Sequence, residues 1–348
     1  MLIGRPWSVP ANSSRYFGDR DEALAQPSAT IQLAWDGHLL NAAFDASLIA
    51  HDDRYYTGVT DIAGAVQVPT LGYMDRIASH LEPGFRVVDI GCGQGELVEA
   101  LRATGVDAIG FDPAVRRPTD HLTGRYWEPG DASADLFVMR CVLPHIADPW
   151  SFLAGIAESC PGAKVLIEFQ TLEWICDRSI WYQLSHDHVN LFSVDDFTSR
   201  FTVVDSGAFA DGEWGWVLVD PAGGWGGGRA EDSVVPAVES LLDTRTRVLR
   251  DAVDAGRPIA IWGAAGKGQV LCHALVRAGV SDVLAIDADR QRWGQHLELS
   301  GVEVIAPGAV VDRCADRAVW VANPNHLPSV TRFLAHAGLD GPVVAQHE

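Results

Sequence analysis

The chain has 348 residues, and its 46 acidic side chains against 26 basic ones give a formal net charge of −20. A nucleic-acid-binding face requires clustered Lys and Arg that neutralise phosphates, so this balance argues against nucleic acid as a partner. It argues equally against attachment to an anionic membrane surface. Hydrophobic residues make up 47% of the chain, enough to bury a core, and the length indicates about two domains with room for a small extra module.

The cysteines and the first residues of the chain indicate the cellular compartment of the protein. None of the six cysteines belongs to a Cys-x-x-Cys pair, so the sequence predicts neither a zinc ribbon nor a thioredoxin-type motif. Scattered thiols in a chain of this size are typical of a reducing compartment. The N-terminus lacks the basic stretch and apolar run of a signal peptide, and no segment resembles a membrane span. We therefore expect a soluble, cytoplasmic protein.

Regular patterns begin in the second fifth of the chain. Residues 1–70 show few clear periods, and we expect them to be irregular, with turns at 12–14 and 27–28. Helices are expected at 71–81, 95–105 and 150–160, and short apolar strands at 86–91, 106–112, 135–143 and 163–170. Strands that alternate with helices indicate a parallel α/β sheet with right-handed connections.

A second α/β pattern follows a glycine-rich segment, residues 221–233, which is typical of a linker. Beyond it we expect a helix at 234–255, a strand, glycine turn and helix at 257–279, and strands at 280–287 and 318–324. The sequence therefore predicts an N-terminal module at 1–68, an α/β domain at 69–220, the linker at 221–233, and a Rossmann-like α/β domain at 234–348.

The strongest functional signal is a glycine-rich turn between a predicted strand and a predicted helix. Gly91, Gly93 and Gly95 let the backbone approach a ligand closely, at the place where parallel sheets bind nucleotide-type ligands. Asp112 ends the next strand, where an acidic side chain accepts ribose hydroxyls. A turn without a ligand and a dinucleotide site are the alternatives. The spacing is not GxGxxG, however, and Asp89 would repel a pyrophosphate but suits an ammonium group.

Residues 87–96, Val-Val-Asp-Ile-Gly-Cys-Gly-Gln-Gly-Glu, resemble motif I of the class I S-adenosylmethionine-dependent methyltransferases. The resemblance implies S-adenosyl-L-methionine as cofactor and S-adenosyl-L-homocysteine as product. Residues 135–146 resemble that family's fourth strand and the segment after it. This implies that Arg140 lies beside the cofactor and that His145 is either a structural residue near the pocket or a catalytic one. Asp131, with Glu128 as a rival, is the expected partner of the adenine amino group.

Other stretches resemble the three-domain sugar C-methyltransferases of natural-product pathways. Residues 37–45 match a Gly-His/Leu-x-x-Asn-x-x-Phe-Asp stretch of their N-terminal module, but the zinc-binding cysteines that commonly precede it are absent. A structural zinc site needs four ligands, and the first 70 residues offer only His38 and His51 as histidine or cysteine ligands. We therefore expect no metal. Tyr55 and Tyr56 stand where the family has a tyrosine that reaches the substrate.

Residues 180–197 resemble the family's Tyr-x-Glu-His-x-x-Tyr-Phe-Ser segment, with His186, Asp187 and His188 in place of its tyrosine, glutamate and histidine. In the family, the histidine is proposed to remove a proton from the carbon beside a ketone. A histidine that titrates near neutrality suits this role, so we expect His188 to be the general base and Asp187 to orient it. On an extended segment, His186 and His188 would face the same side. An exposed polar loop and a metal site are the alternatives.

Residues 261–268 resemble the Gly-Ala-x-x-Lys-Gly stretch that opens the family's third domain. Lys267, near a predicted helix N-terminus, is placed to meet a diphosphate, because the helix dipole and the ammonium both favour anions. A solvated turn lysine is the alternative. Trp181 is one of several tryptophans that flank the proposed acceptor site.

Together these features predict a methyltransferase that acts on a small molecule in natural-product or antibiotic biosynthesis, as a monomer or homodimer. The expected reaction is C-methylation at an acidic carbon next to a carbonyl, as in a nucleotide-linked keto-sugar. The family's tyrosines are missing at positions 186 and 191, and tryptophans are numerous. Two alternatives therefore stay open: an O- or N-methyltransferase for a non-sugar metabolite, and a relative that retains the cofactor without methylating.

Overall fold

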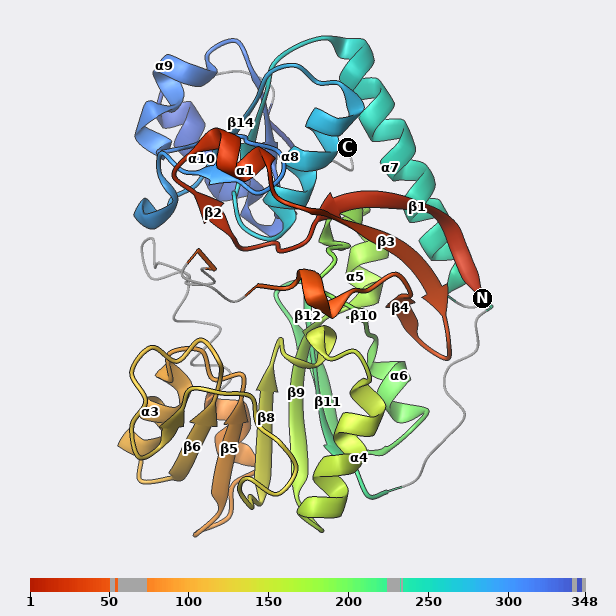
Figure 1. The fold of residues 1–348 in the computed structure, drawn as a ribbon, viewed down its shortest axis with the longest axis vertical. Coiled ribbons are helices and arrows are strands. Elements are labelled where there is room, and N and C mark those ends of the chain that lie inside the picture. Colours follow the sequence, from red (N-terminus) through yellow and green to blue (C-terminus); the bar gives the residue numbers. More distant parts are fainter. Residues whose placement is uncertain (51–53, 56–73, 224–231, 233, 340–342, 346–348) are drawn as a thin grey trace.

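The computed structural model describes residues 1–50, 54–55, 74–223, 232, 234–339 and 343–345. A seven-stranded sheet occupies the lower half of Figure 1 and a five-stranded parallel sheet the upper half. A four-stranded sheet, built mostly from N-terminal strands, lies between them at one side. This α/β architecture with predominantly parallel sheets confirms the fold class predicted from the sequence.

The seven-stranded sheet has the order β11-β12-β9-β8-β5-β6-β7. Its parallel strands are β5 (Arg86–Ile90), β6 (Asp107–Phe111), β7 (Leu122–Thr123), β8 (Leu136–Arg140) and β9 (Lys164–Gln170). A hairpin of β11 (Thr202–Phe209) and β12 (Trp214–Asp220) adds antiparallel to β9. The helices are α3 (Glu96–Ala103), α4 (Pro149–Ser159), α5 (Leu172–Asp177) and α6 (Val194–Thr198), and residues 74–79 are also helical. Every element expected between residues 86 and 170 is present.

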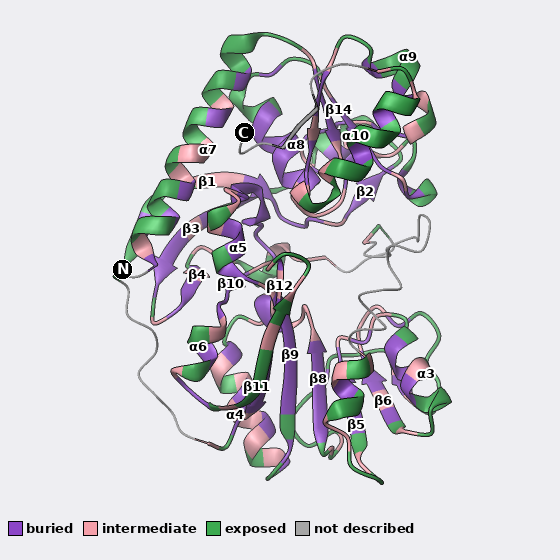
Figure 2. Cartoon of the chain, turned by 180° about the vertical axis from the view of Figure 1, so that it is seen from behind, coloured by how far each residue is buried: buried purple, intermediate pink, exposed green. Residues whose placement is uncertain are grey.

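The central strands of this sheet are covered on both faces, as Figure 2 shows for β8 and β9. Successive residues of a strand point to opposite faces. Val87 and Leu136 therefore pack in one hydrophobic cluster, and their neighbours Val88 and Phe137 pack in another. A strand buried on both faces reads as a continuous apolar run, which explains why the sequence predicts these strands well.

The first 50 residues form a sheet, so the expectation that they are irregular is wrong. β1 (Leu2–Pro10), β3 (Ser28–Trp35) and β4 (Leu39–Asn41) pair antiparallel and are extended by β10 (Asn190–Leu191). The segment also contains β2 (Tyr16–Phe17) and α1 (Arg20–Leu24). The strand signal of β1 is hidden by Gly4 and Pro6, since both residues are unusual inside strands, and a register shift interrupts its pairing between Ile3 and Trp7.

The five-stranded sheet confirms the second α/β pattern of the sequence. Its order is β16-β14-β13-β17-β18, and all its pairs are parallel. The strands are β13 (Ile259–Trp262), β14 (Val283–Ile286), β16 (Val304–Ile305), β17 (Ala318–Val321) and β18 (Val343–Ala345). The helices are α7 (Val235–Ala255), α8 (Lys267–Ala278), α9 (Val310–Cys314) and α10 (Leu327–His336). β15 (His296–Leu297) pairs with β2 of the N-terminal segment.

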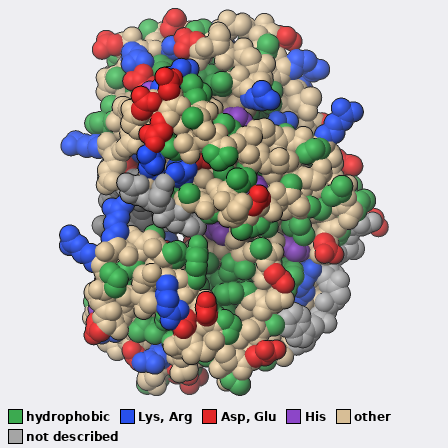
Figure 3. All heavy atoms as spheres, in the orientation of Figure 1, with side chains coloured by type: hydrophobic (Ala, Val, Ile, Leu, Met, Phe, Trp, Pro, Cys, Tyr) green, Lys and Arg blue, Asp and Glu red, His purple; other side chains and the backbone are tan. Residues whose placement is uncertain are grey.

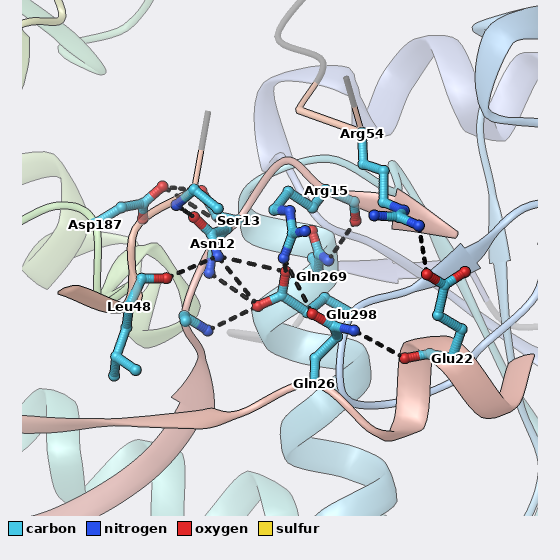
Figure 4. A network of polar contacts seen from close by, with 12 residues as sticks. Asn12, Ser13, Arg15, Glu22, Gln26, Leu48, Arg54, Asp187, Gln269 and Glu298 are labelled. Atoms are coloured by element: carbon cyan, nitrogen blue, oxygen red, sulfur yellow. Dashed lines mark hydrogen bonds and ion pairs between the residues drawn. The ribbon is translucent and has the colours of Figure 1, made fainter. Parts of the chain in front are cut away.

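The N-terminal segment is joined closely to this C-terminal unit. One hydrophobic cluster combines Ile31 of β3, Val238 of α7 and Leu271 of α8. The buried Glu298 adds a polar network (Figure 4): its Oε1 accepts from the backbone N–H of Asn12 at 3.2 Å, and its Oε2 accepts from Nη1 of Arg15 at 3.3 Å. The two segments therefore share one core, although they lie at opposite ends of the chain.

Among the described residues, no helix combines the length and apolar character needed to cross a bilayer. On the face shown in Figure 3, Lys and Arg side chains lie scattered among Asp and Glu side chains and form no continuous stripe. Histidine side chains are visible near the middle of this face.

Candidate active site

The glycine-rich turn lies between β5 and α3, at the carboxyl end of β5. The strand order reverses at β5, because β6 follows on one side and β8 on the other. Such switch points are the usual ligand sites of open parallel sheets. Gly91 and Gly95 have φ values of +77° and +96°, and a Cβ on Gly91 would lie 2.2 Å from Cγ2 of Val142. Gly93, between them, also has a positive φ. The turn therefore needs glycine and leaves its backbone accessible to a ligand.

Asp89 stands at the end of β5, with 2% of its surface exposed. Its Oδ1 has no hydrogen-bond partner among the described residues. Burial, partly offset by the charge of Arg140, raises the pKa of this carboxyl to about 7. A buried carboxylate oxygen without a partner favours a cation and disfavours an anion. The position therefore fits an ammonium group and does not fit a pyrophosphate.

Asp112 follows β6 at the same edge of the sheet. Its Oδ2 accepts from the backbone N–H of Gly93 at 2.9 Å, and its Oδ1 accepts from the N–H of Ala114 at 2.6 Å. These two bonds orient the carboxylate and tie it to the glycine turn. Each oxygen retains a lone pair for a further donor, such as a ribose hydroxyl.

Two other predicted cofactor residues are paired with neighbouring side chains. Asp131 accepts two hydrogen bonds from Arg125, at 2.5 and 2.7 Å. Glu128, its rival, meets Asp131 through its backbone N–H at 2.6 Å. Nε of Arg140 lies 3.8 Å from Oε1 of the buried Glu168. The charge of Arg140 is therefore partly compensated at the carboxyl end of β8.

Residues 66–204, which include the glycine turn and strands β5 to β9, match the family described as "Methyltransferase domain". The chain contains a methyltransferase domain. Its cofactor is S-adenosyl-L-methionine, and S-adenosyl-L-homocysteine is the product. The protein is therefore an S-adenosylmethionine-dependent methyltransferase, as the sequence predicts.

The structure is similar to several solved methyltransferase structures. One is a chain of the complex between the Haloferax volcanii Trm112 methyltransferase activator and a methyltransferase, with 20% identity, 47% of this chain and 98% of that chain covered, and a TM-score of 0.34. A second is the glycopeptide N-methyltransferase MtfA, with 15% identity, coverage of 43% and 89%, and a TM-score of 0.33. A third is the S-adenosylmethionine-dependent methyltransferase of Anabaena variabilis, with 14% identity, coverage of 44% and 84%, and a TM-score of 0.34. No curated protein matches the chain.

A pair of histidines lies beyond the carboxyl ends of β8 and β9 of the methyltransferase domain. His145 ends the 3₁₀ turn η2 (Leu143–His145) after β8, and its Nδ1 lies 2.6 Å from the backbone carbonyl oxygen of Asp187. His188 packs edge-on against it, with ring centroids 4.6 Å apart. Burial, together with the charges of His145 and Lys267, lowers the pKa of His188 to about 4. His188 is therefore neutral at pH 7.

Asp187 does not hold His188 through its carboxylate. Its Oδ2 accepts from the hydroxyl of Ser13 at 2.7 Å, and the histidine that Asp187 contacts through its carbonyl is His145. Although burial acts to raise it, the charges of His188 and His145 hold the pKa of Asp187 below its usual value. The carboxylate therefore links the N-terminal segment to the histidine pair and influences His188 through its charge.

His186 does not share the surroundings of His188. The chain bends at residues 186 and 187, so the expectation that both rings face the same side is wrong. The ring of His186 is fully buried. Its Nδ1 donates to the carbonyl of Thr30 at 3.1 Å, and its Nε2 accepts from the N–H of Asp45 at 3.1 Å. Both ring nitrogens are therefore used to hold the N-terminal module.

Tyr55 borders both parts of the site. Its backbone forms an antiparallel bridge with Arg15. Burial, together with the charges of Asp187 and Asp112, raises the pKa of its hydroxyl. One of these carboxylates belongs to the histidine segment and the other follows β6 at the glycine turn, so the charges of both parts act on Tyr55. Tyr56 lies outside the described residues.

Lys267 is held by a carboxylate from the turn between β11 and β12 of the seven-stranded sheet. Its Nζ donates to Oε1 of Glu213 at 2.7 Å, and Glu213 has 3% of its surface exposed. Glu213 also accepts from the side-chain amides of Asn323, at 3.0 and 3.1 Å, and Asn325, at 2.9 Å. The ammonium lies 5.2 Å from the ring centroid of Trp174. A diphosphate could reach Lys267 only in competition with this carboxylate.

Trp181 lies in the core that joins the N-terminal sheet to α7 and α8, with 1% of its surface exposed. The guanidinium of Arg245 lies 5.7 Å from its ring centroid. The ring is therefore part of this core and does not face open space. Two residues that sequence reasoning missed lie nearer the site: Gln183, which contacts His188, and Glu213. Neither belongs to a motif that would identify it.

The sequence predicts no metal site in the N-terminal module. In the described part of the chain, no group of three His, Cys, Asp or Glu side chains is arranged to hold a metal ion. Nε2 of His38 lies 2.8 Å from Oδ1 of Asn190, and its Nδ1 lies 3.3 Å from Nε1 of Trp150. Its ring stacks on Phe192. His51 lies outside the described residues.

Proposed function

We propose that this methyltransferase transfers a methyl group to an acidic carbon next to a carbonyl of a small molecule in natural-product biosynthesis. The observation that carries the proposal is the contact between His145 and His188 at the edge of the sheet that carries the cofactor turn. Methylation of carbon requires both removal of a proton and stabilisation of the enolate that results. Two adjacent imidazoles supply one group for each task.

The cofactor side of the proposal rests on the glycine turn. Asp89 offers the ammonium group a buried carboxylate oxygen that no described residue binds, and Asp112 offers an oriented carboxylate to the ribose. When bound, the cofactor supplies a methyl group that its sulfonium already activates. The residues of the chain therefore contribute mainly alignment and proton transfer.

The acceptor class that the sequence resemblance implies is a nucleotide-linked keto-sugar. A second candidate is O- or N-methylation of a metabolite that is not a sugar nucleotide. The observation that favours it is the ion pair of Lys267 with Glu213, because the cation expected to bind a diphosphate already has a carboxylate partner at 2.7 Å.

The test is incubation of the enzyme with S-adenosyl-L-methionine and a panel of nucleotide-linked keto-sugars, the matching free keto-sugars, and hydroxylated or amino metabolites. Release of S-adenosyl-L-homocysteine identifies acceptors, and NMR then locates the new methyl group. A methyl on the carbon beside the carbonyl supports the proposal, and a methyl on oxygen or nitrogen supports the second candidate. No release above background with any acceptor would favour a relative that retains the cofactor without methylating.

A His188→Ala variant separates the acceptor side from the cofactor side. We expect it to bind S-adenosyl-L-homocysteine like the wild type and to lose at least about 100-fold in turnover, the usual range for a proton-transfer or oxyanion group. His336→Ala is the matched control, because this histidine is exposed on α10 and, within the described ranges, bonds only to the carbonyl of Arg332. Normal turnover of His188→Ala would reject a catalytic role for this residue.

A further inference from the structure

The protonation state of each active-site histidine follows from the partner of its Nδ1. A neutral imidazole has one N–H and one lone pair, so the hydrogen bond at one nitrogen determines the state of the other. Nδ1 of His145 lies 2.6 Å from the carbonyl oxygen of Asp187. A carbonyl oxygen can only accept, so Nδ1 carries the proton. Nε2 of His145 therefore carries the lone pair.

Gln183 imposes the opposite state on His188. The side-chain nitrogen of Gln183 lies 3.1 Å from Nδ1 of His188, and an amide nitrogen can only donate. Gln183 is 6% exposed, and it ends the 3₁₀ turn η3 (Trp181–Gln183), where its own N–H donates to the carbonyl of Ile180 at 2.9 Å. This bond fixes the backbone of Gln183, while Oε1 of its side chain has no hydrogen-bond partner among the described residues. With the amide nitrogen facing the ring, Nδ1 of His188 accepts and Nε2 of His188 carries the proton.

From this geometry we propose that His145 is the proton acceptor of the site, that His188 is its hydrogen-bond donor, and that Gln183 is the positioning residue that sets the tautomer of His188. The inference rests on the proposed C-methylation, and it reverses the role that the sequence assigns to His188. Neither Nε2 atom has a hydrogen-bond partner among the described residues, so both are available to an acceptor molecule. The two rings lie 4.6 Å apart between centroids, close enough to act on neighbouring atoms of one substrate.

The reaction balances with these roles. The C–H bond beside the carbonyl breaks, its proton moves to Nε2 of His145, and its electron pair moves toward the carbonyl oxygen. The N–H of His188 donates to that oxygen as the enolate forms. The enolate carbon then bonds to the methyl carbon while the methyl–sulfur bond breaks, and the electron pair of that bond returns to sulfur as a neutral thioether. The lowered pKa of His188, about 4, makes it a poor proton acceptor but keeps it a neutral donor.

The tautomers are measured by NMR on protein labelled with ¹⁵N-histidine, in the presence of S-adenosyl-L-homocysteine and without any acceptor. We expect the long-range ¹H–¹⁵N pattern of an unprotonated Nε2 for His145 and of an unprotonated Nδ1 for His188. Spectra of His145→Gln and His188→Gln assign the two rings. A protonated Nδ1 on His188, or an unprotonated Nδ1 on His145, overturns the inference.

Variants of Gln183 test its positioning role with the same readout. Gln183→Glu offers only acceptor oxygens, so we expect His188 to change to the tautomer with a protonated Nδ1, while His145 is unaffected. Gln183→Leu removes the donor, and we expect averaged shifts for His188. A His188 spectrum unchanged in both variants overturns the role of Gln183. Unaltered affinity for S-adenosyl-L-homocysteine shows that the variants are folded.

Activity with a methyl acceptor identified from the panel distinguishes the roles of the two histidines. A glutamine amide can donate as Nε2–H does, but it cannot accept a proton. We therefore expect His188→Gln to stay within about 10-fold of the wild-type kcat and His145→Gln to lose roughly 100-fold or more. The reverse order overturns the assignment. If the tautomers are as expected but no acceptor is methylated, the tautomer assignment stands and the proposed function fails.

Discussion

Asp89→Asn should weaken cofactor binding and at the same time stabilise the protein without cofactor. The carboxyl is buried, and its pKa is raised from 3.8 to about 7. Between these two values the folded state holds a proton that the unfolded state has lost, so the cost of the carboxyl grows as the pH rises toward the folded pKa and levels off above it. The difference of about 3 pKa units corresponds to about 4 kcal/mol at pH 8. Asparagine carries no charge and avoids this cost.

The expected net gain is smaller than that ceiling. The asparagine amide would occupy the place of an oxygen that has no partner among the described residues, and an unpaired buried donor costs about 1 to 3 kcal/mol. We therefore expect Asp89→Asn to gain about 1 to 3 kcal/mol at pH 8. The shape of the pH dependence does not depend on the amide. The advantage of the variant should increase by about 1.4 kcal/mol per pH unit between pH 5 and 7 and level off above.

Urea unfolding of the cofactor-free protein between pH 5 and 8 measures the stability, and calorimetric titration with S-adenosyl-L-homocysteine measures binding. We expect binding to weaken about 10- to 100-fold, because a hydrogen bond to a charged group contributes about 1.5 to 3 kcal/mol. Asp107→Asn is the control, since this carboxylate is 51% exposed and pairs with Arg86 at the opposite edge of the sheet. A pH-independent stability difference, or unchanged affinity, would refute the role of Asp89.

Three further expectations concern the acceptor side. Lys267→Met leaves the buried carboxylate of Glu213 without its cation, so we expect the free energy of unfolding in urea to fall by about 3 kcal/mol. The double variant with Glu213→Gln should recover part of this loss, and additive losses would contradict the coupling. Unfolded histidine binds a proton below about pH 6.5, but folded His188 does so only below about 4. The contribution of His188 to stability should therefore be lost as the pH falls from 6.5 toward 4. His188→Gln should flatten that part of the plot of unfolding free energy against pH. His186→Leu should cost about 1 to 3 kcal/mol, because the N–H of Asp45 loses its acceptor and the carbonyl of Thr30 keeps only the amide of Asn41, without changing affinity for S-adenosyl-L-homocysteine; a selective loss of affinity would place His186 in the site.

The cofactor edge is predictable from sequence because its determinants are local. Asp89 and the glycines stand within seven consecutive residues, and the strand and helix around them carry their own apolar patterns. The acceptor side depends on contacts between distant positions. Ser13 and Asp187 are 174 residues apart, and Glu213 and Lys267 are 54 apart. No local pattern contains such pairs. The sequence therefore predicts a ligand for Lys267 and does not identify Glu213 as its carboxylate partner.

The roles of the histidines are hidden for a related reason. A motif names the residue types but not the direction of the backbone, and one bend at 186–187 gives His186 and His188 different partners. The tautomer of each ring then depends on atoms of other segments. The carbonyl of Asp187 meets His145 across 42 residues, and any residue type presents such a carbonyl. The sequence can therefore identify the two histidines, but it does not show which one accepts the proton and which one donates a hydrogen bond.

The seven-stranded and five-stranded sheets carry opposite charges at equivalent places. In the methyltransferase domain the order reverses at β5, where the buried Asp89 has a carboxylate oxygen with no hydrogen-bond partner among the described residues. In the C-terminal sheet the order reverses at β13, and the donors there are Lys267 at the start of α8 and Asn323 after β17. The anion that they hold is Glu213 of the β11–β12 hairpin, within the same chain. An intramolecular partner has a high effective concentration. The second switch point therefore docks one sheet on the other, and a Rossmann-like topology at this position does not by itself imply a nucleotide ligand.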